Sequence, residues 1–229
     1  MLKPQYLDLL ITGLWITLLI VVTTFFTSII LGSVVAFSRL SSNKIVSSIA
    51  NIYVEICRNV PGLFWIMFFY FVFPEILPSD LAKNVNSYIY YPIVAGIIGL
   101  TVDNSSYVSD IIRSGVLSVP KGEREAGIAM GLNNTQLWIY VLFPHTLRTV
   151  FPPLSSRMIH NLKNSSLCMA IGAPEITWAT QQIESLTFRG MEATIVATLV
   201  YISLALLLTI LFSQIENRLK LSRNSIYQH

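Results

Sequence analysis

Composition alone excludes an ordinary soluble domain. The chain has 229 residues, of which 53% are hydrophobic and 12% are charged. Soluble domains carry about 25% charged residues, so this chain has too few charges to cover a water-facing surface. Its 15 Lys and Arg residues lie scattered between apolar runs and form no basic stripe that would bind a nucleic acid. We therefore expect an integral membrane protein.

Stretches without Asp, Glu, Lys or Arg locate the membrane spans. They cover residues 9–38, 59–74, 84–102 and 193–215. A helix needs about 20 residues to cross the hydrocarbon core, so the second span must begin earlier, and a further apolar segment is interrupted by Arg157 and Lys163. The pattern predicts an all-α integral membrane protein that forms one transmembrane domain over 1–229, with five transmembrane helices at roughly 10–38, 49–73, 90–112, 150–171 and 192–216.

The distribution of Lys and Arg predicts the orientation, because cytoplasmic loops of membrane proteins are enriched in these residues. With the N-terminus outside, the inner side receives Arg39, Lys44, Arg113, Lys121, Arg124, Arg148, Arg218, Lys220 and Arg223, and the outer side receives Lys3, Lys83 and Arg189. This asymmetry favours an outside N-terminus, an inside C-terminus and a cytoplasmic loop over 113–148.

The predicted loop 113–148 is charged and amphipathic, and it is too polar to span the membrane. Small side chains crowd the short helix expected around residues 123–132, and they would permit close approach of another protein surface. An ordinary amphipathic helix lying at the membrane interface is the alternative.

One motif in this loop resembles a known family. Glu125-Ala126-Gly127, then Gly131, then Val141-Leu142-Phe143-Pro144 resembles the EAA loop of ATP-binding-cassette (ABC) import permeases, with Gly127 in place of the second alanine. Four further segments are similar to polar amino-acid permeases of that superfamily, in the same order: 53–61, 107–115, 118–122 and 163–167.

The resemblance implies a type I importer fold in the bacterial cytoplasmic (inner) membrane. The chain would form half of a path for a small-molecule amino acid, leaning to glutamate, aspartate, glutamine or a broad range. Its implied partners are an external substrate-binding protein, a second permease subunit (the same chain or a paralogue), a cytoplasmic ATPase dimer and membrane lipid. The sequence has no phosphate-binding G-x-x-x-x-G-K-[ST] motif, so we expect no enzyme and no cofactor in this chain, with ATP and Mg on the ATPase.

The resemblance also assigns roles within the loop. The residues that would couple to the ATPase are Glu125, Ala126, Gly127 and Gly131 in the coupling helix, with Lys121, Glu123 and Arg124 at its rim. A helix C-cap is a second, compatible interpretation of Gly131.

Ionisable residues at membrane depth are costly and indicate a binding or helix-pairing role. A cation, an amide and two hydroxyls follow one another at Lys163, Asn164, Ser165 and Ser166, a combination able to receive an amino-acid carboxylate. The other candidate substrate ligands are Asp103 with Asn104, where Asp103 would hold the ammonium group, and Glu55 with Arg58.

Each candidate has a structural alternative. The 164–166 segment would pair helices, Asp103 would neutralise Lys163 or Arg157, and Arg58 would extend its guanidinium to water at the inner end of its helix. A channel or an ion-coupled carrier would use similar helices but would leave the inner loop without a role. A membrane-embedded enzyme would need a nucleophile and a base at recognisable spacing, which the sequence lacks.

Overall fold

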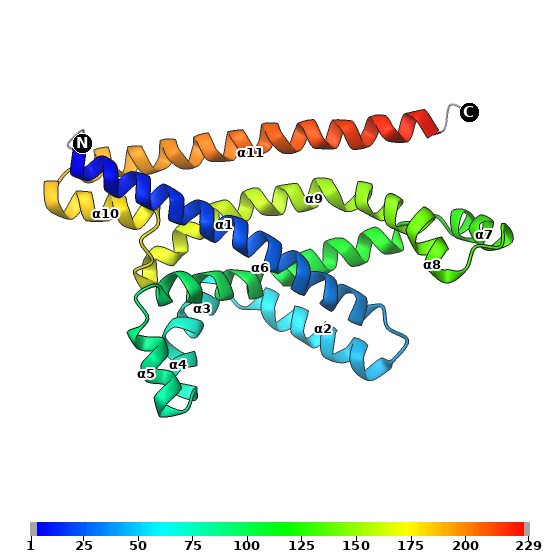
Figure 1. The fold of residues 1–229 in the computed structure, drawn as a ribbon, viewed down its shortest axis with the longest axis horizontal. Helices are drawn as coiled ribbons and strands as arrows, with labels where there is room; N and C mark the ends of the chain where they lie inside the picture. The colour runs from blue at the N-terminus through cyan, green and yellow to red at the C-terminus, as the bar shows by residue number, and fades with distance from the viewer. Residues whose placement is uncertain (1–3, 227–229) are drawn as a thin grey trace.

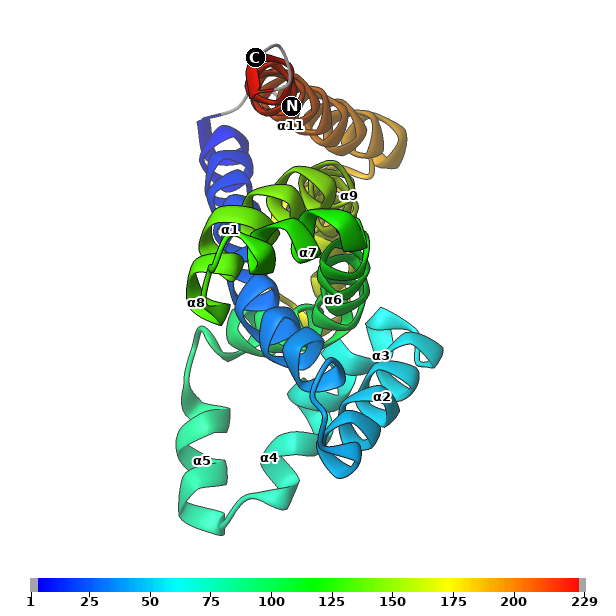
Figure 2. The same ribbon diagram turned by 90° about the vertical axis from the view of Figure 1, so that its right-hand side faces the viewer.

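Four long helices define the architecture. The computed structural model describes residues 4–226, with side chains described as far as Leu219, so Lys3 and the side chains of Lys220 and Arg223 lie outside the described part. The helices α1 (Pro4–Arg39), α6 (Tyr91–Leu117), α9 (Phe143–Asn164) and α11 (Gly190–Ile226) run along the long axis (Figure 1). Helix α6 packs on both α1 and α9, which also contact each other, and α11 packs on α9, as the end-on view in Figure 2 also shows. All regular structure within 4–226 is helical, as the sequence predicts.

Small residues bring α1 and α6 close together. Gly32 is buried on the side of α1 that faces α6, whereas Gly13 and Thr17 are buried against the start of α10. A Cβ atom added at Gly32 would lie 2.7 Å from the Cγ1 atom of Val108 on α6. Such close backbone approach is typical of helix pairs in membranes, where packing replaces the hydrophobic driving force.

The predicted second span, 49–73, is not one helix. Its first part is α2 (Lys44–Asn59), and its second part consists of α3 (Gly62–Met67), the π-helix η1 (Phe68–Val72) and α4 (Phe73–Ile76). The two parts meet at 103°. Proline disfavours the helical conformation of the residue before it, and Val60, before Pro61, is extended with ψ 127°. The sharp bend therefore has a local cause in the sequence.

Both π-helical segments end at a proline. Segments η1 and η2 (Trp138–Leu142) each run into a Phe-Pro pair, Phe73-Pro74 and Phe143-Pro144. The backbone N–H of each phenylalanine bonds the carbonyl five residues earlier. Since a proline ring clashes with the carbonyl four residues before it, widening the helix there relieves the clash.

One end of the molecule, which is the predicted inner end, carries α7 (Lys121–Ala129) and α8 (Asn134–Leu137). Helix α6 continues to Leu117 and α9 begins at Phe143, so helices occupy both ends of the predicted loop 113–148. At the opposite end α5 (Ser79–Ser87) projects at 105° to α6, and α10 (Ile176–Thr187) lies between α1 and α11 (Figure 1).

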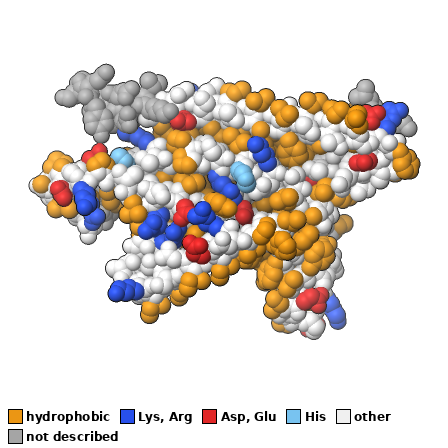
Figure 3. Space-filling view, turned by 180° about the vertical axis from the view of Figure 1, so that it is seen from behind, with side chains coloured by type: hydrophobic (Ala, Val, Ile, Leu, Met, Phe, Trp, Pro, Cys, Tyr) orange, Lys and Arg blue, Asp and Glu red, His pale blue; other side chains and the backbone are white. Residues whose placement is uncertain are grey.

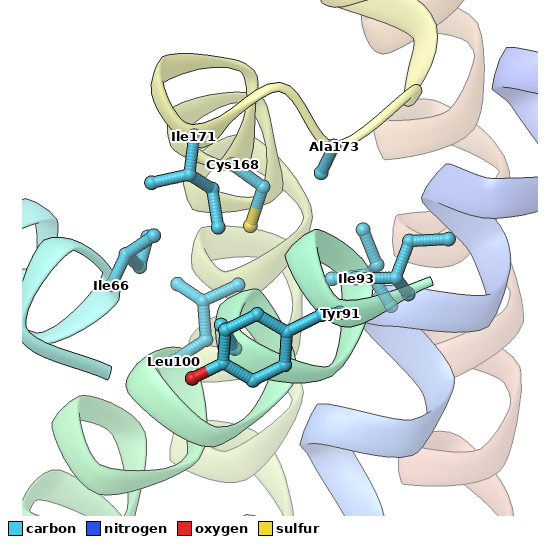
Figure 4. Packing of buried hydrophobic residues seen from close by; sticks show 9 residues of the cluster. Ile66, Tyr91, Ile93, Leu100, Cys168, Ile171 and Ala173 are labelled. Carbon is cyan, nitrogen blue, oxygen red and sulfur yellow. The ribbon is translucent and has the colours of Figure 1, made fainter. Parts of the chain in front are cut away.

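The 3-10 helix η3 (Ser165–Ile171) joins α9 to a buried apolar cluster. It forms the last part of the predicted span 150–171, so that span changes helix type at Ser165 and does not continue as one α-helix. Buried side chains from α3, α6, η3 and the segment after it pack together around Cys168, and Figure 4 shows them: Ile66, Tyr91, Ile93, Leu100, Ile171 and Ala173.

Length and apolarity identify α1 and α11 as candidate membrane spans, or four candidates if each bent helix pair counts as one span. Helix α9 does not meet this test within the described residues, because it carries several polar and charged side chains. The five-span count and the orientation stay predictions.

Topology is testable at two exposed residues on opposite ends of the molecule, Asn84 on α5 and Asn134 on α8. We expect a single cysteine at Asn84 to react with an impermeant maleimide added outside intact cells, and one at Asn134 to react only after the membrane is opened. The parent protein would carry Cys57→Ala and Cys168→Ala and serve as the unlabelled control. Outside labelling of both positions would contradict the orientation.

Candidate functional site

An ion pair between α6 and α9 lies at the centre of the polar residues. The Arg157 Nη2 atom donates to the Asp103 Oδ2 atom at 2.7 Å, with side chains 12% and 8% exposed. A buried charge is stable only when it is paired and hydrogen-bonded. The pairing of Asp103 with Arg157 was one of the structural alternatives from the sequence, and the ligand role of Asp103 stays a proposal.

Charges continue along the same face of α6. Asp103, Tyr107 and Asp110 are four and three residues apart and therefore share that face. The Arg157 guanidinium carbon lies 3.8 Å from the centroid of the Tyr107 ring, and that of Arg58 on α2 lies 5.2 Å from it. Arg58 also donates to the Oδ2 atom of Asp110. We call Asp103, Tyr107, Asp110, Arg58 and Arg157 the charge ladder.

The ladder runs from a buried end at Asp103 and Arg157 to an accessible end at Arg58. Figure 3, seen from behind, shows acidic, basic and histidine side chains gathered across the middle of the molecule, with apolar side chains around them. Arg58 is 47% exposed at its side chain. No group of three or more His, Cys, Asp or Glu side chains in the described part of the chain is arranged to hold a metal ion.

The predicted 163–166 cluster is less concentrated than its sequence suggests. Lys163 is exposed, and Ser165 and Ser166 turn back to bond the carbonyl oxygens of Leu162 and Lys163 within their own helix. Asn164 is the member that approaches the ladder, because its Nδ2 atom lies 3.3 Å from His160 Nδ1, which in turn lies 3.3 Å from Arg157 Nη1.

Asn104 and Glu55 take different positions. Asn104 is buried and donates to Asn161 Oδ1 at 2.8 Å, and Asn161 donates to the Val21 carbonyl, so the pair joins α6, α9 and α1. Glu55 is exposed on α2 and accepts a long hydrogen bond from Asn59.

The sequence interpretation missed Glu175, the one acidic side chain among the fully buried residues described. It caps α10 by accepting from the backbone N–H groups of Thr177 and Trp178, and it accepts from the Tyr201 hydroxyl at 2.7 Å. An acidic residue directly before a helix is a recognisable cap signal, whereas the tyrosine on α11 is distant in sequence.

The connection between α6 and α9 is a compact, capped unit. Helix α7 ends in a Schellman motif, in which Gly131 N–H bonds the Ile128 carbonyl and Leu132 N–H bonds the Gly127 carbonyl. Gly131 has φ +80°, so the C-cap interpretation is confirmed. Gly127 faces inward, since an added Cβ atom would lie 2.6 Å from Leu137 on α8.

The opposite side of α7 has no cover within the described chain. Lys121, Arg124, Glu125 and Ala126 are exposed, and so are two apolar side chains, Ile128 at 56% and Met130 at 73%. Glu123 at the rim lies 3.6 Å from His145 on α9. A helix with exposed apolar side chains and a rigid cap is suited to contact another protein.

Comparison with known proteins decides the family. Residues 28–221 match the family of binding-protein-dependent transport system inner membrane components. The chain belongs to this family. The resemblance found in the sequence is thereby confirmed, and this permease is an inner membrane component of an ABC transport system.

Relatives of the permease cover nearly its full length. The glutamine transport system permease protein of Escherichia coli is 31% identical over 94% of each chain. The arginine transport system permease protein of Bacillus subtilis is 29% identical over 95% of this chain and 94% of its own. The glutamate transport system permease protein of Corynebacterium glutamicum is 32% identical over 93% of this chain and 76% of its own.

Solved structures show the same fold. The crystal structure of an amino acid ABC transporter with histidines superposes with a TM-score of 0.80 at 28% identity, covering 93% of this chain and 95% of that one. The MetNI methionine ABC transporter, at 19% identity, superposes with a TM-score of 0.78 over 95% of this chain and 99% of that one, and supports the fold alone.

The buried pair predicts a specific pattern of stabilities. Asp103→Leu would leave the Arg157 guanidinium buried without its anion, and removing one partner of a buried pair costs about 3–5 kcal/mol. We expect the thermal midpoint of the detergent-solubilised permease to fall in this variant and to recover in Asp103→Leu/Arg157→Met. Glu55→Gln removes an exposed carboxylate and serves as the control. Additive losses in the double variant would contradict a coupled pair.

Proposed function

We propose that this permease forms half of the translocation path of an ATP-driven importer for a polar amino acid. An external binding protein delivers the substrate, a second permease subunit completes the path, and a cytoplasmic ATPase dimer contacts α7. The observation that carries the proposal is the continuity of α6, which bears the charge ladder and leads through a three-residue connection into α7.

Coupling through α7 has a mechanical basis. A soluble ATPase can move membrane helices only through a protruding part that is rigid and continuous with them. The Schellman motif and the Gly127–Leu137 contact stiffen the loop, and α6 and α9 enter it from either side. Exposed Ile128 and Met130 supply an apolar centre, with Glu125 and Arg124 as polar rim.

The charge ladder suits a zwitterion. An amino acid in a low-dielectric path needs partners of both signs, because an unpaired charge there costs several kcal/mol. Asp103 and Arg157 together offer one anion and one cation, while Asn164 and His160 lie beside Arg157. Relatives named for glutamine, glutamate and arginine transport support a polar amino acid as the class of substrate.

Uptake by the complete transporter tests this function. The permease, its ATPase, its second permease subunit and its binding protein would be reconstituted in proteoliposomes with ATP on the ATPase side. We expect ATP-dependent accumulation of labelled glutamate, aspartate or glutamine, and none without the binding protein. Accumulation without ATP would instead support an ion-coupled carrier, and absence of any amino-acid transport would overturn the proposal.

The coupling loop depends on backbone conformation at Gly131. An added Cβ atom meets nothing within 4 Å, yet the left-handed conformation costs about 1–2 kcal/mol for most L-residues. We expect Gly131→Val to reduce ATPase co-purification and substrate-stimulated hydrolysis, whereas Gly131→Asn keeps most of both, because asparagine tolerates this conformation.

Gly122→Ala is the matched control, since an added Cβ atom there also meets nothing within 4 Å and its φ is negative. Equal hydrolysis in the valine and asparagine variants would remove the loop conformation from the coupling mechanism.

A further inference from the structure

Asp110 on α6 is shared by two arginines. Its Oδ1 atom accepts from Arg39 Nη1 at 2.5 Å, and its Oδ2 atom accepts from Arg58 Nη1. One carboxylate cannot neutralise two guanidinium groups. Together with the Asp103–Arg157 pair, which meets this group at the Tyr107 ring, these side chains comprise three cations and two anions. Among these five side chains, one positive charge is in excess.

The two arginines are held very differently. Arg39 is 11% exposed, and it also donates to Asn51 Oδ1 at 2.8 Å and to Ser109 Oγ at 3.3 Å. Arg58 is 47% exposed, and beyond Asp110 its guanidinium faces the Tyr107 ring. If Arg58 left, Asp110 would keep Arg39 as its partner. The excess charge is therefore the one on Arg58, since an exposed ion pair contributes little and is easily exchanged.

Glu55 is not the ion-pair partner of Arg58. It lies three residues earlier on α2, and its carboxylate contacts the side-chain amide of Asn59 at 3.5 Å. The Glu55 side chain is exposed to the surroundings. The guanidinium of Arg58 is thus accessible, with Asp110 as its acidic contact.

Arg58 and Arg157 face the same tyrosine ring, at 5.2 Å and 3.8 Å from its centroid. Both guanidinium groups therefore lie beside the same aromatic ring, each also paired with an acidic side chain of α6. A guanidinium binds a carboxylate through two parallel charge-assisted hydrogen bonds. It binds a side-chain amide more weakly, because the amide carries no negative charge.

We propose that Arg58 exchanges Asp110 for the side-chain carboxylate of the substrate, and so makes the path selective for an acidic amino acid over its amide. This inference rests on the proposed function. The net charge of −1 on glutamate or aspartate matches the one excess positive charge among the five paired side chains. Glutamine would leave that charge with Asp110, and arginine would add a second unmatched cation.

Direct binding to the transporter tests the proposal without the selectivity of the binding protein. The purified complex of both permease subunits and the ATPase would be titrated with labelled L-glutamate and L-glutamine. We expect wild type to prefer glutamate about tenfold or more, and Arg58→Gln to lose that preference while glutamine affinity changes less than about twofold. Arg58→Lys should keep part of the preference, and Lys44→Gln, which removes an exposed cation from the same helix, should keep all of it.

The variant Asp110→Asn distinguishes two roles of Arg58: binding the substrate carboxylate, and only holding α2 against α6. If Arg58 only fastens α2 to α6, Asp110→Asn and Arg58→Gln break the same contact and should have the same effect. Under the proposal they act in opposite directions, because removing the competing carboxylate raises glutamate affinity. Equal changes in the two variants, or a wild type that binds both amino acids equally, would overturn the inference and leave the proposed function standing. A wild-type complex that binds neither amino acid would also overturn the inference, whereas ATP-dependent uptake with the binding protein present tests the proposed function separately.

Discussion

The arrangement of the polar helices depends on the buried contact between Asp103 and Arg157. In a chain with only 12% charged residues, both charges lie inside the helix bundle, where each is acceptable only because the other is present. The contact fixes α6 against α9, and the Asn104–Asn161 pair joins the same two helices one residue further along α6. It also fixes the Arg157 guanidinium over the Tyr107 ring. The same ring faces Arg58, so it connects the Asp103–Arg157 pair with the Arg58–Asp110 pair.

Helix α6 links this polar centre to the α7 end of the molecule. Along one side it packs on α1 through small residues such as Gly32, and along another it presents the charge ladder. Its end leads into α7, whose capped loop returns to α9 and therefore to the other half of the ion pair. A force applied to α7 would act on both helices that hold the buried pair. Alternating exposure of the ladder would then need relative movement of only α6 and α9 against α2.

The sequence predicted features that arise from local composition and missed those that depend on distant contacts. Long charge-free stretches predicted α1 and α11, and the EAA-like pattern located the loop that contains α7. The 103° break was missed although Pro61 marks it, because charge-free length was used to define the span. Lys163 was weighted as a ligand from its neighbours in sequence, but helical geometry leaves it exposed and places Asn164 nearer the ladder. The buried carboxylate of Glu175 accepts a hydrogen bond from Tyr201, a residue on a distant helix that no local sequence pattern could identify.

The central claim is that movement of α7 changes access to the ladder face of α6. Ser114 lies on this face, four residues beyond Asp110, and is exposed. In an otherwise cysteine-free transporter, the rate at which Ser114→Cys reacts with a hydrophilic maleimide from the ATPase side would be compared between the nucleotide-free and ATP-trapped states. The account predicts slower labelling of Ser114→Cys in the trapped state, and no effect of ATP on its labelling when the ATPase is absent. Equal rates for Ser114→Cys in both states would contradict it.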